Sequence, residues 1–245
     1  MRAAAVGAAI LGHALVLYAV AAPWLVRLRR APAPAEEPPD IHVARMRLYR
    51  RVVMQQAVIV GTVAVIAILG RLPAASLGLT MPRSWWLSGA LAAAIGGALV
   101  WSAIRLRRKA AADPEQFQHR GAAVLPESAG ERRWFAAAGL GGAISEELLF
   151  RGFLFYYFSV YLPAANDPVK VILSSLVFAA GHLYQGWRGT AMSFAVSVAL
   201  ATLYALSGSL LLPLLVHAVG NLRGLLIFSR HRETSTPEAT GDAPV

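Results

Sequence analysis

Residues 134–160 read WFAAAGLGGAISEELLFRGFLFYYFSV. Apart from Glu146, Glu147 and Arg151, this stretch carries no charge. It is long enough to cross the roughly 30 Å hydrocarbon core of a bilayer, which takes about 20 residues of helix. Placing a charge in the middle of a membrane is costly, so charged residues there are rare and mark functional sites. The stretch therefore predicts a membrane helix that carries a functional site.

The whole chain has the composition of an integral membrane protein. Of its 245 residues, 57% are hydrophobic and only 15% are charged. The apolar residues fall in long blocks and lack amphipathic spacing. Seven blocks have the size of membrane helices: 4–26, 52–70, 85–104, 134–160, 169–184, 190–207 and 209–228. The sequence therefore predicts an all-α, polytopic transmembrane bundle of about seven helices.

The basic residues predict how these helices are oriented. The formal net charge is +10. Seventeen Lys and Arg residues fall on one side of the predicted bundle, mainly in loops 27–51 and 105–133, and four fall on the other side. Because basic loops stay in the cytoplasm, we expect an outside N-terminus and a cytoplasmic C-terminus, with the plasma membrane as the location. We expect the basic loops to contact anionic lipid, and we expect no nucleic-acid partner.

Composition divides the chain into three parts. Residues 1–132 contain three predicted helices, 133–228 contain every unusual polar membrane residue, and 229–245 predict a disordered cytoplasmic tail. The Pro-rich stretch 31–39, APAPAEEPP, predicts a non-helical linker. The first block includes Ala19-Val20-Ala21, which resembles a signal-peptidase site, but the arginines that follow favour a retained helix.

Three polar motifs occupy three different predicted helices. They are EELLFR at 146–151, FAAGH at 178–182 and HAVGN at 217–221. Residues four apart share a helix face, whereas adjacent residues differ by about 100°. We therefore expect Arg151 to hold Glu147 while Glu146 faces the interior of the bundle. The absence of cysteine excludes disulfides and thiolate chemistry, which leaves His, Asp, Glu and Ser to carry any reaction.

In this order, the motifs resemble the CAAX protease and bacteriocin-processing (CPBP, also called Abi) family of intramembrane proteases, which includes the Ras-converting endopeptidases. The family pattern is EExxxR, FxxxH and HxxxN or HxxxD on successive membrane helices. The resemblance extends from Trp134 to Phe228 and does not cover residues 1–132. It implies peptide-bond hydrolysis, with a catalytic core in the last four helices.

The resemblance also implies a role for each motif residue. Glu146 and His182 are expected to activate a water, and His217 and Asn221 to stabilise the tetrahedral oxyanion. Such roles suit a partly desolvated carboxylate and N–H donors aimed at a developing charge. Supporting positions are Glu147 and Arg151, as an ion pair, and Phe178, in packing or substrate contact.

The sequence leaves the need for a metal open. Glu146, His182 and His217 offer a carboxylate and two imidazoles, a set that suits catalytic zinc. The HExxH signature is missing, however, and the better-supported mechanism of the family depends on glutamate without metal. We expect no required cofactor, with zinc as the alternative.

The sequence also allows functions other than proteolysis. Buried carboxylates and histidines also occur in ion- or proton-coupled transporters, although the chain shows no internal repeat. A non-catalytic scaffold or immunity protein would use the same residues as a structural ion pair and as interhelical hydrogen bonds. We expect a peptide or protein substrate, with or without attached lipid. Arg223 is expected to snorkel to the membrane surface, with binding of a substrate carboxylate as the alternative.

Overall fold

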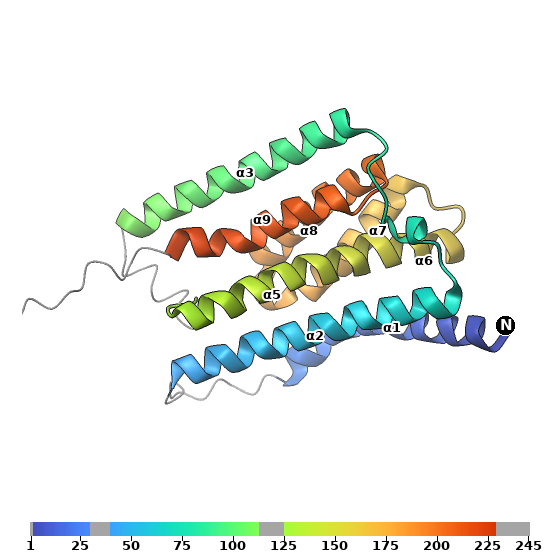
Figure 1. Cartoon of the computed structure of the whole chain (residues 1–245), viewed down its shortest axis with the longest axis horizontal. Helices are drawn as coiled ribbons and strands as arrows, with labels where there is room; N and C mark the ends of the chain where they lie inside the picture. The colour runs from blue at the N-terminus through green and yellow to red at the C-terminus, as the bar shows by residue number, and fades with distance from the viewer. Residues whose placement is uncertain (1, 30–39, 113–124, 229–245) are drawn as a thin grey trace, which may run out of the picture.

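The structure is a computed structural model that describes residues 2–29, 40–112 and 125–228, which are almost entirely helical and include no strand (Figure 1). The helices are α1 (Arg2–Arg29), α2 (Ile41–Gly70), α3 (Trp85–Ala112), α5 (Ala129–Glu147), α6 (Leu154–Tyr161), α7 (Asp167–Gly181), α8 (Gly186–Ser207) and α9 (Leu211–Phe228). A π-helical turn, η2 (Leu148–Phe153), joins α5 and α6 into one continuous rod. The prediction of an all-α bundle of about seven long helices is confirmed.

Several helices begin or end beyond the apolar blocks that predicted them. α2 begins at Ile41, so the basic residues of its first turns are helical and the predicted loop 27–51 is too long. Likewise, α3 continues to Ala112 and α5 begins at Ala129, which shortens the predicted loop 105–133. An apolar block marks only the part of a helix that lies in the hydrocarbon core of the bilayer. A capping residue can start the helix outside that core, before the apolar block begins. Asp40, for example, accepts a hydrogen bond from the backbone N–H of Val43 and starts α2 early.

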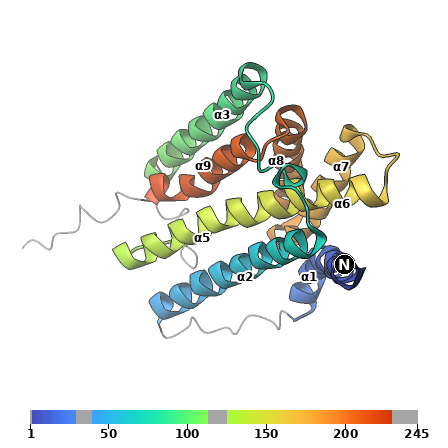
Figure 2. The same ribbon diagram turned by 45° about the vertical axis from the view of Figure 1, so that its right-hand side comes forward.

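Helix α5 lies at the centre of the bundle. Both views show it between α2 and α9, with α3 on the far side of α9 (Figures 1 and 2). α7 and α8 pack against each other, and α8 also contacts α9 and α3. The π-helical turn therefore lies where helices from both halves of the chain meet, and its Phe153 and the following Leu154 are fully buried in the main apolar core.

Three of the described helices are long and apolar enough to cross a membrane, Ile41–Gly70, Trp85–Lys109 and Leu183–Ser207. Shorter apolar helices occupy Ala5–Ala21 and Leu211–Leu225. Many large apolar side chains, including Trp86 and Ile68, are exposed on the outside of the bundle. An outer surface of this kind needs a lipid environment, so the protein is an integral membrane protein. The predicted linker 31–39 and tail 229–245 lie outside the described residues.

A buried ionic cluster joins the first turns of α2 and α5. The carboxylate of Glu131 is almost fully buried and accepts hydrogen bonds from the backbone N–H groups of Glu127 and Ser128, at 2.7 and 2.8 Å. His42 lies 3.1 Å and Arg45 3.5 Å from the same carboxylate. Burial by itself would raise the pKa of Glu131, but these four donors outweigh it and lower the pKa to about 2.

Glu131→Gln tests this cluster. A carboxylate whose pKa is lowered by folding stabilises the native state above its unfolded pKa near 4.5, and this stabilisation is lost as the pH falls toward 2. We expect the substitution to lower the free energy of unfolding at pH 7 by up to about 3 kcal/mol, the equivalent of the pKa shift. Thermal unfolding in detergent should show the gap between the two proteins closing between pH 4.5 and 2. A gap that is constant with pH would contradict the ionic interpretation.

Candidate active site

The two adjacent glutamates at the end of α5 have different surroundings. The side chain of Glu147 is fully buried, whereas that of Glu146 is 29% exposed. Glu146 faces a cavity of about 560 Å³ that opens between α3, α7, α8 and α9. The 100° offset between neighbouring helix residues thus separates a carboxylate that is held in the protein from one that is available to a ligand.

The guanidinium of Arg151 holds Glu147 in place from the π-helical turn. Its Nη1 lies 2.9 Å from Oε1 of Glu147. Its Nη2 donates to both the carbonyl and the hydroxyl of Ser197 on α8, at 3.1 and 2.8 Å. The guanidinium also lies over the ring of Phe178 on α7, 5.0 Å from its centroid. The predicted pair of Arg151 with Glu147 is confirmed, and Arg151 ties this pair to two further helices.

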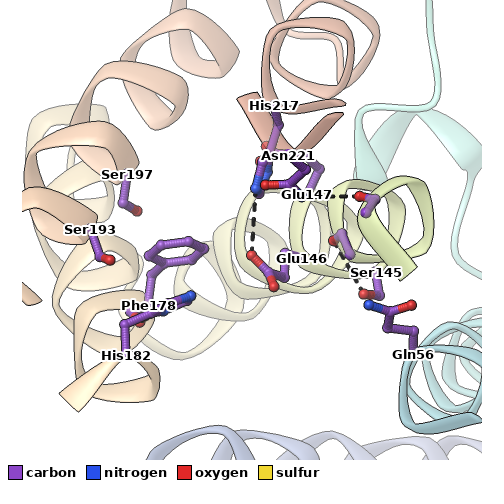
Figure 3. Close-up of polar contacts among 12 residues, drawn as sticks. Gln56, Ser145, Glu146, Glu147, Phe178, His182, Ser193, Ser197, His217 and Asn221 are labelled. Atoms are coloured by element: carbon purple, nitrogen blue, oxygen red, sulfur yellow. Dashed lines mark hydrogen bonds and ion pairs between the residues drawn. The ribbon is translucent and has the colours of Figure 1, made fainter. Parts of the chain in front are cut away.

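His217 on α9 lies between the two carboxylates. Its Nδ1 is 2.7 Å from Oε1 of Glu147, and its Nε2 is 3.6 Å from Oε2 of Glu146. Because the buried carboxylate of Glu147 can only accept, Nδ1 carries the proton that it donates. Glu147 therefore orients the imidazole so that Nε2 faces Glu146 and the cavity, a pairing in which a carboxylate positions a histidine for chemistry. Figure 3 shows the approach of His217 to Glu146 as a dashed line.

His182 comes from another side of the cavity. It directly follows the last residue of α7, and its Nδ1 donates to the carbonyl of Phe178 at 2.8 Å. Its ring stacks on that of Phe178, with centroids 4.3 Å apart and planes 22° apart. These contacts leave Nε2 free to accept a hydrogen bond. Figure 3 shows Phe178 and His182 projecting from their helix across from Glu146 and His217.

Asn221 is one helical turn beyond His217 and also lines the cavity. Its Nδ2 donates to the carbonyl of Gly139 on α5, at 3.0 Å. Gly139 and Gly142 of α5 lie beside Asn221, where a Cβ at either position would be 3.4 to 3.5 Å away, in ordinary van der Waals contact. One of the two N–H bonds of the amide is thus engaged with α5, and the other is left for a ligand.

The three side chains that the sequence suggested as zinc ligands are not arranged as a zinc site in this structure. Among the residues that the structure describes, no three His, Cys, Asp or Glu side chains are close enough together to hold a metal ion. His217 approaches Glu146, whereas the ring of His182 is hydrogen-bonded to the backbone of Phe178 and stacked on its side chain. The set Glu146, His182 and His217 therefore does not fit a zinc site as the side chains are arranged.

Several contacts of the site were not predicted from the sequence. Ser197 carries no motif, and only its position beside Arg151 shows its role. Gln56 on α2 donates to the carbonyl of Ala138, behind the glutamates. The contact of His217 with Glu147 was not predicted either, because the sequence does not show which of two adjacent carboxylates a histidine on another helix reaches. A polar Gln or Ser within an apolar block was the available signal for the first two.

Arg151→Met tests how much the buried ion pair contributes. The substitution leaves Glu147 as a fully buried charge without its cation, which we expect to cost about 3–5 kcal/mol of folding free energy. Adding Glu147→Gln should restore part of that loss, since the double variant buries no unpaired charge. Thermal unfolding of the wild type, both single variants and the double variant measures the coupling. Additive losses would show that the two side chains do not act as a pair.

The fold and the site define a helical membrane protein with a carboxylate and two histidines around one internal cavity. A family model described as type II CAAX prenyl endopeptidase, Rce1-like, matches residues 129–223. The matched stretch begins with α5, ends within α9 and includes all seven predicted site residues. This match covers less than half of the chain, and it confirms the resemblance found in the three motifs. No curated protein and no solved structure matches the chain.

Proposed function

We propose that the protein is a glutamate-dependent intramembrane endopeptidase that hydrolyses peptide bonds of membrane-associated peptides or proteins. The observation that carries this proposal is the separation of the two glutamates. Glu147 is buried and holds His217, whereas Glu146 beside it is exposed to the cavity. A carboxylate in a largely apolar cavity is suited to accept a proton from water.

In the proposed reaction, a water lies between Glu146 and Nε2 of His182. Glu146 takes one proton of the water, and the remaining hydroxide attacks the carbonyl carbon of the peptide. The oxyanion that forms accepts hydrogen bonds from the free N–H of Asn221 and from Nε2–H of His217 in its protonated form. The C–N bond then breaks, and the proton on Glu146 passes to the leaving amine. The products are a new carboxylate and a new amine.

The walls of the cavity favour an apolar substrate. Side chains from α3 and α8 line it, among them Ile95, Leu99, Met192 and Val196. Such a surface suits aliphatic side chains or an attached lipid chain, and it lies between helices that face the membrane. This supports a membrane-anchored substrate of the CAAX type, which is the substrate class of the matched family's description.

We further propose the plasma membrane as the location, with the N-terminus outside. The support is the strong excess of basic residues on the side of the bundle where α2 begins and α3 ends. Figure 1 shows these two ends, the start of α5 and the end of α9 together at one end of the molecule.

Glu146→Gln tests the proposed function. The purified protein in detergent is given S-prenylated and unmodified peptides, and products are identified by mass spectrometry. We expect the wild type to cleave and the variant to lose about 10²–10⁴-fold in kcat, the usual contribution of a general base. The matched control is Glu127→Gln, which makes the same change at an exposed glutamate far from the cavity.

The same assay separates the alternatives. Cleavage that survives treatment with a chelator agrees with the metal-free reaction, whereas loss of activity on chelation would assign it to a metal. A well-folded wild type that cleaves none of the peptides would favour the scaffold or transporter functions. Retention of full activity by Glu146→Gln would exclude Glu146 as the base.

A further inference from the structure

A second cavity lies at the end of the bundle opposite to the first residues of α2 and α5, where Figure 1 shows α6 and the loop that leads from it to α7. Its volume is about 310 Å³, and its walls come from the loop before α3, α6, the start of α7 and the end of α8. The polar side chains that line it are Ser76, Arg83, Ser159, Asp167, Lys170 and Tyr204. The proposed reaction uses none of them, so their presence in one cavity calls for another ligand.

Basic residues are scarce at this end of the bundle. The sequence places only four of them on this side: Arg2, Arg71, Arg83 and Lys170. Membrane proteins keep most of their basic residues at the opposite, cytoplasmic side. The last two nevertheless line the same cavity, which indicates that the cavity binds an anion.

The ammonium group of Lys170 is only partly neutralised by the protein. Its side chain is 15% exposed, and its Nζ lies 3.4 Å from the carboxylate of Asp167, which is itself 61% exposed. An ion pair to a carboxylate that is so well hydrated contributes little. Lys170 is also in the first turn of α7, whose positive end repels a cation and attracts an anion. An anion in the cavity would offset the cost of placing the ammonium group there.

The backbone at Arg83 is fixed to the end of α8. The N–H of Arg83 donates to the carbonyl of Ser207 at 2.8 Å. Thr80 donates its hydroxyl to the carbonyl of Gly208 at 3.1 Å and accepts at its own carbonyl from the hydroxyl of Ser209. Gly208 has a φ of 67°, and a Cβ there would lie 2.7 Å from Nε of Arg83. The guanidinium is thus held beside the cavity, and no carboxylate of the described chain pairs with it, which leaves its donors for a ligand.

An apolar groove continues from the cavity between α7 and α8. Its volume is about 330 Å³, and it shares Asp167 and Ala205 with the cavity. Its other walls are Pro168, Val171, Ile172, Thr202 and Leu206. Ile172 and Leu206 are each 45% exposed on the outer surface, which the bilayer covers. A charged cavity that adjoins an apolar groove is suited to a molecule with an anionic head and an apolar chain.

Two tryptophans place the cavity at the edge of the membrane. Trp85 and Trp86 follow Arg83 by two and three residues, and both are exposed. Tryptophan side chains are enriched at the level of the lipid headgroups. The cations of the cavity are therefore at the depth where the phosphates of phospholipids lie.

We propose that this cavity and the adjoining groove bind an anionic phospholipid. Arg83 and Lys170 bind its phosphate, and an acyl chain lies in the groove between α7 and α8. The two cations and the carboxylate of Asp167 leave one positive charge, which the single negative charge of a phosphodiester balances. Inorganic phosphate would use the same cations but leave the groove empty. The site is separate from the catalytic cavity, so this inference does not depend on the proposed function.

Photo-crosslinking locates the lipid. The delipidated protein in detergent is incubated with phosphatidylglycerol or phosphatidylcholine that carries a diazirine in one acyl chain, and labelled peptides are identified by mass spectrometry. We expect phosphatidylglycerol to label the groove peptides of α7 and α8 about 10-fold more than phosphatidylcholine, because two cations face its headgroup. Equal labelling of these peptides by the two lipids, or labelling only elsewhere, would overturn the inference without the need for any variant.

Variants test the two cations. Arg83→Gln combined with Lys170→Gln should lower groove labelling by phosphatidylglycerol about 10-fold, to the level of phosphatidylcholine. Lys170→Arg keeps the charge and should retain the labelling. The matched control is Arg71→Gln, which removes an exposed arginine at the same end of the bundle that does not line the cavity. Unchanged labelling in the folded double variant would exclude these cations as the headgroup site.

Thermal unfolding separates the lipid from free phosphate. We expect phosphatidylglycerol to raise the Tm of the wild type more than that of the double variant, since the variant lacks the headgroup site. Inorganic phosphate at the same concentration should have little effect on either protein, because it gains nothing from the groove. A rise in Tm with inorganic phosphate that equals the rise with the lipid would assign the cavity to a free anion and overturn the lipid as its occupant.

Discussion

The buried pair of Arg151 and Glu147 is the constraint on which the rest of the site depends. Two charges that are fully removed from solvent are tolerated only when they are paired and hydrogen-bonded. Arg151 is paired with Glu147, donates hydrogen bonds to Ser197 on α8 and lies over the ring of Phe178 on α7. Glu147 in turn is hydrogen-bonded to His217 on α9. The need to satisfy one ion pair thus fixes the relative positions of the helices that surround the cavity.

The separation of roles between the two glutamates follows from this constraint. Because Glu147 is committed to Arg151 and His217, the adjacent Glu146 points to another side of α5, into the cavity. The π-helical turn that begins directly after Glu147 contributes Arg151 to the buried face. Turns of this kind are rare in proteins overall, but those that do occur are often at functional sites, where they alter the helix register locally.

The helices outside the matched stretch also shape the site. Gln56 on α2 binds the backbone of α5 about two turns before the glutamates, and it packs against Gly141 and Gly142. Ile95 and Leu99 on α3 form part of the cavity wall, and Ser102 holds Arg223. The first half of the chain, which carries none of the three motifs, therefore supplies a wall of the cavity and a hydrogen-bond partner for Arg223.

The number of helices, their approximate bounds, the membrane setting and the three motifs could all be predicted from the sequence, because apolar blocks and i, i+4 spacing are local properties. The pairing of Arg151 with Glu147 was predictable for the same reason. The sequence could not show that His217 joins Glu147, that Ser197 holds Arg151 or that Asn221 binds Gly139. These contacts join residues on different helices. They depend on how closely and at what rotation the helices pack, which only the tertiary structure decides.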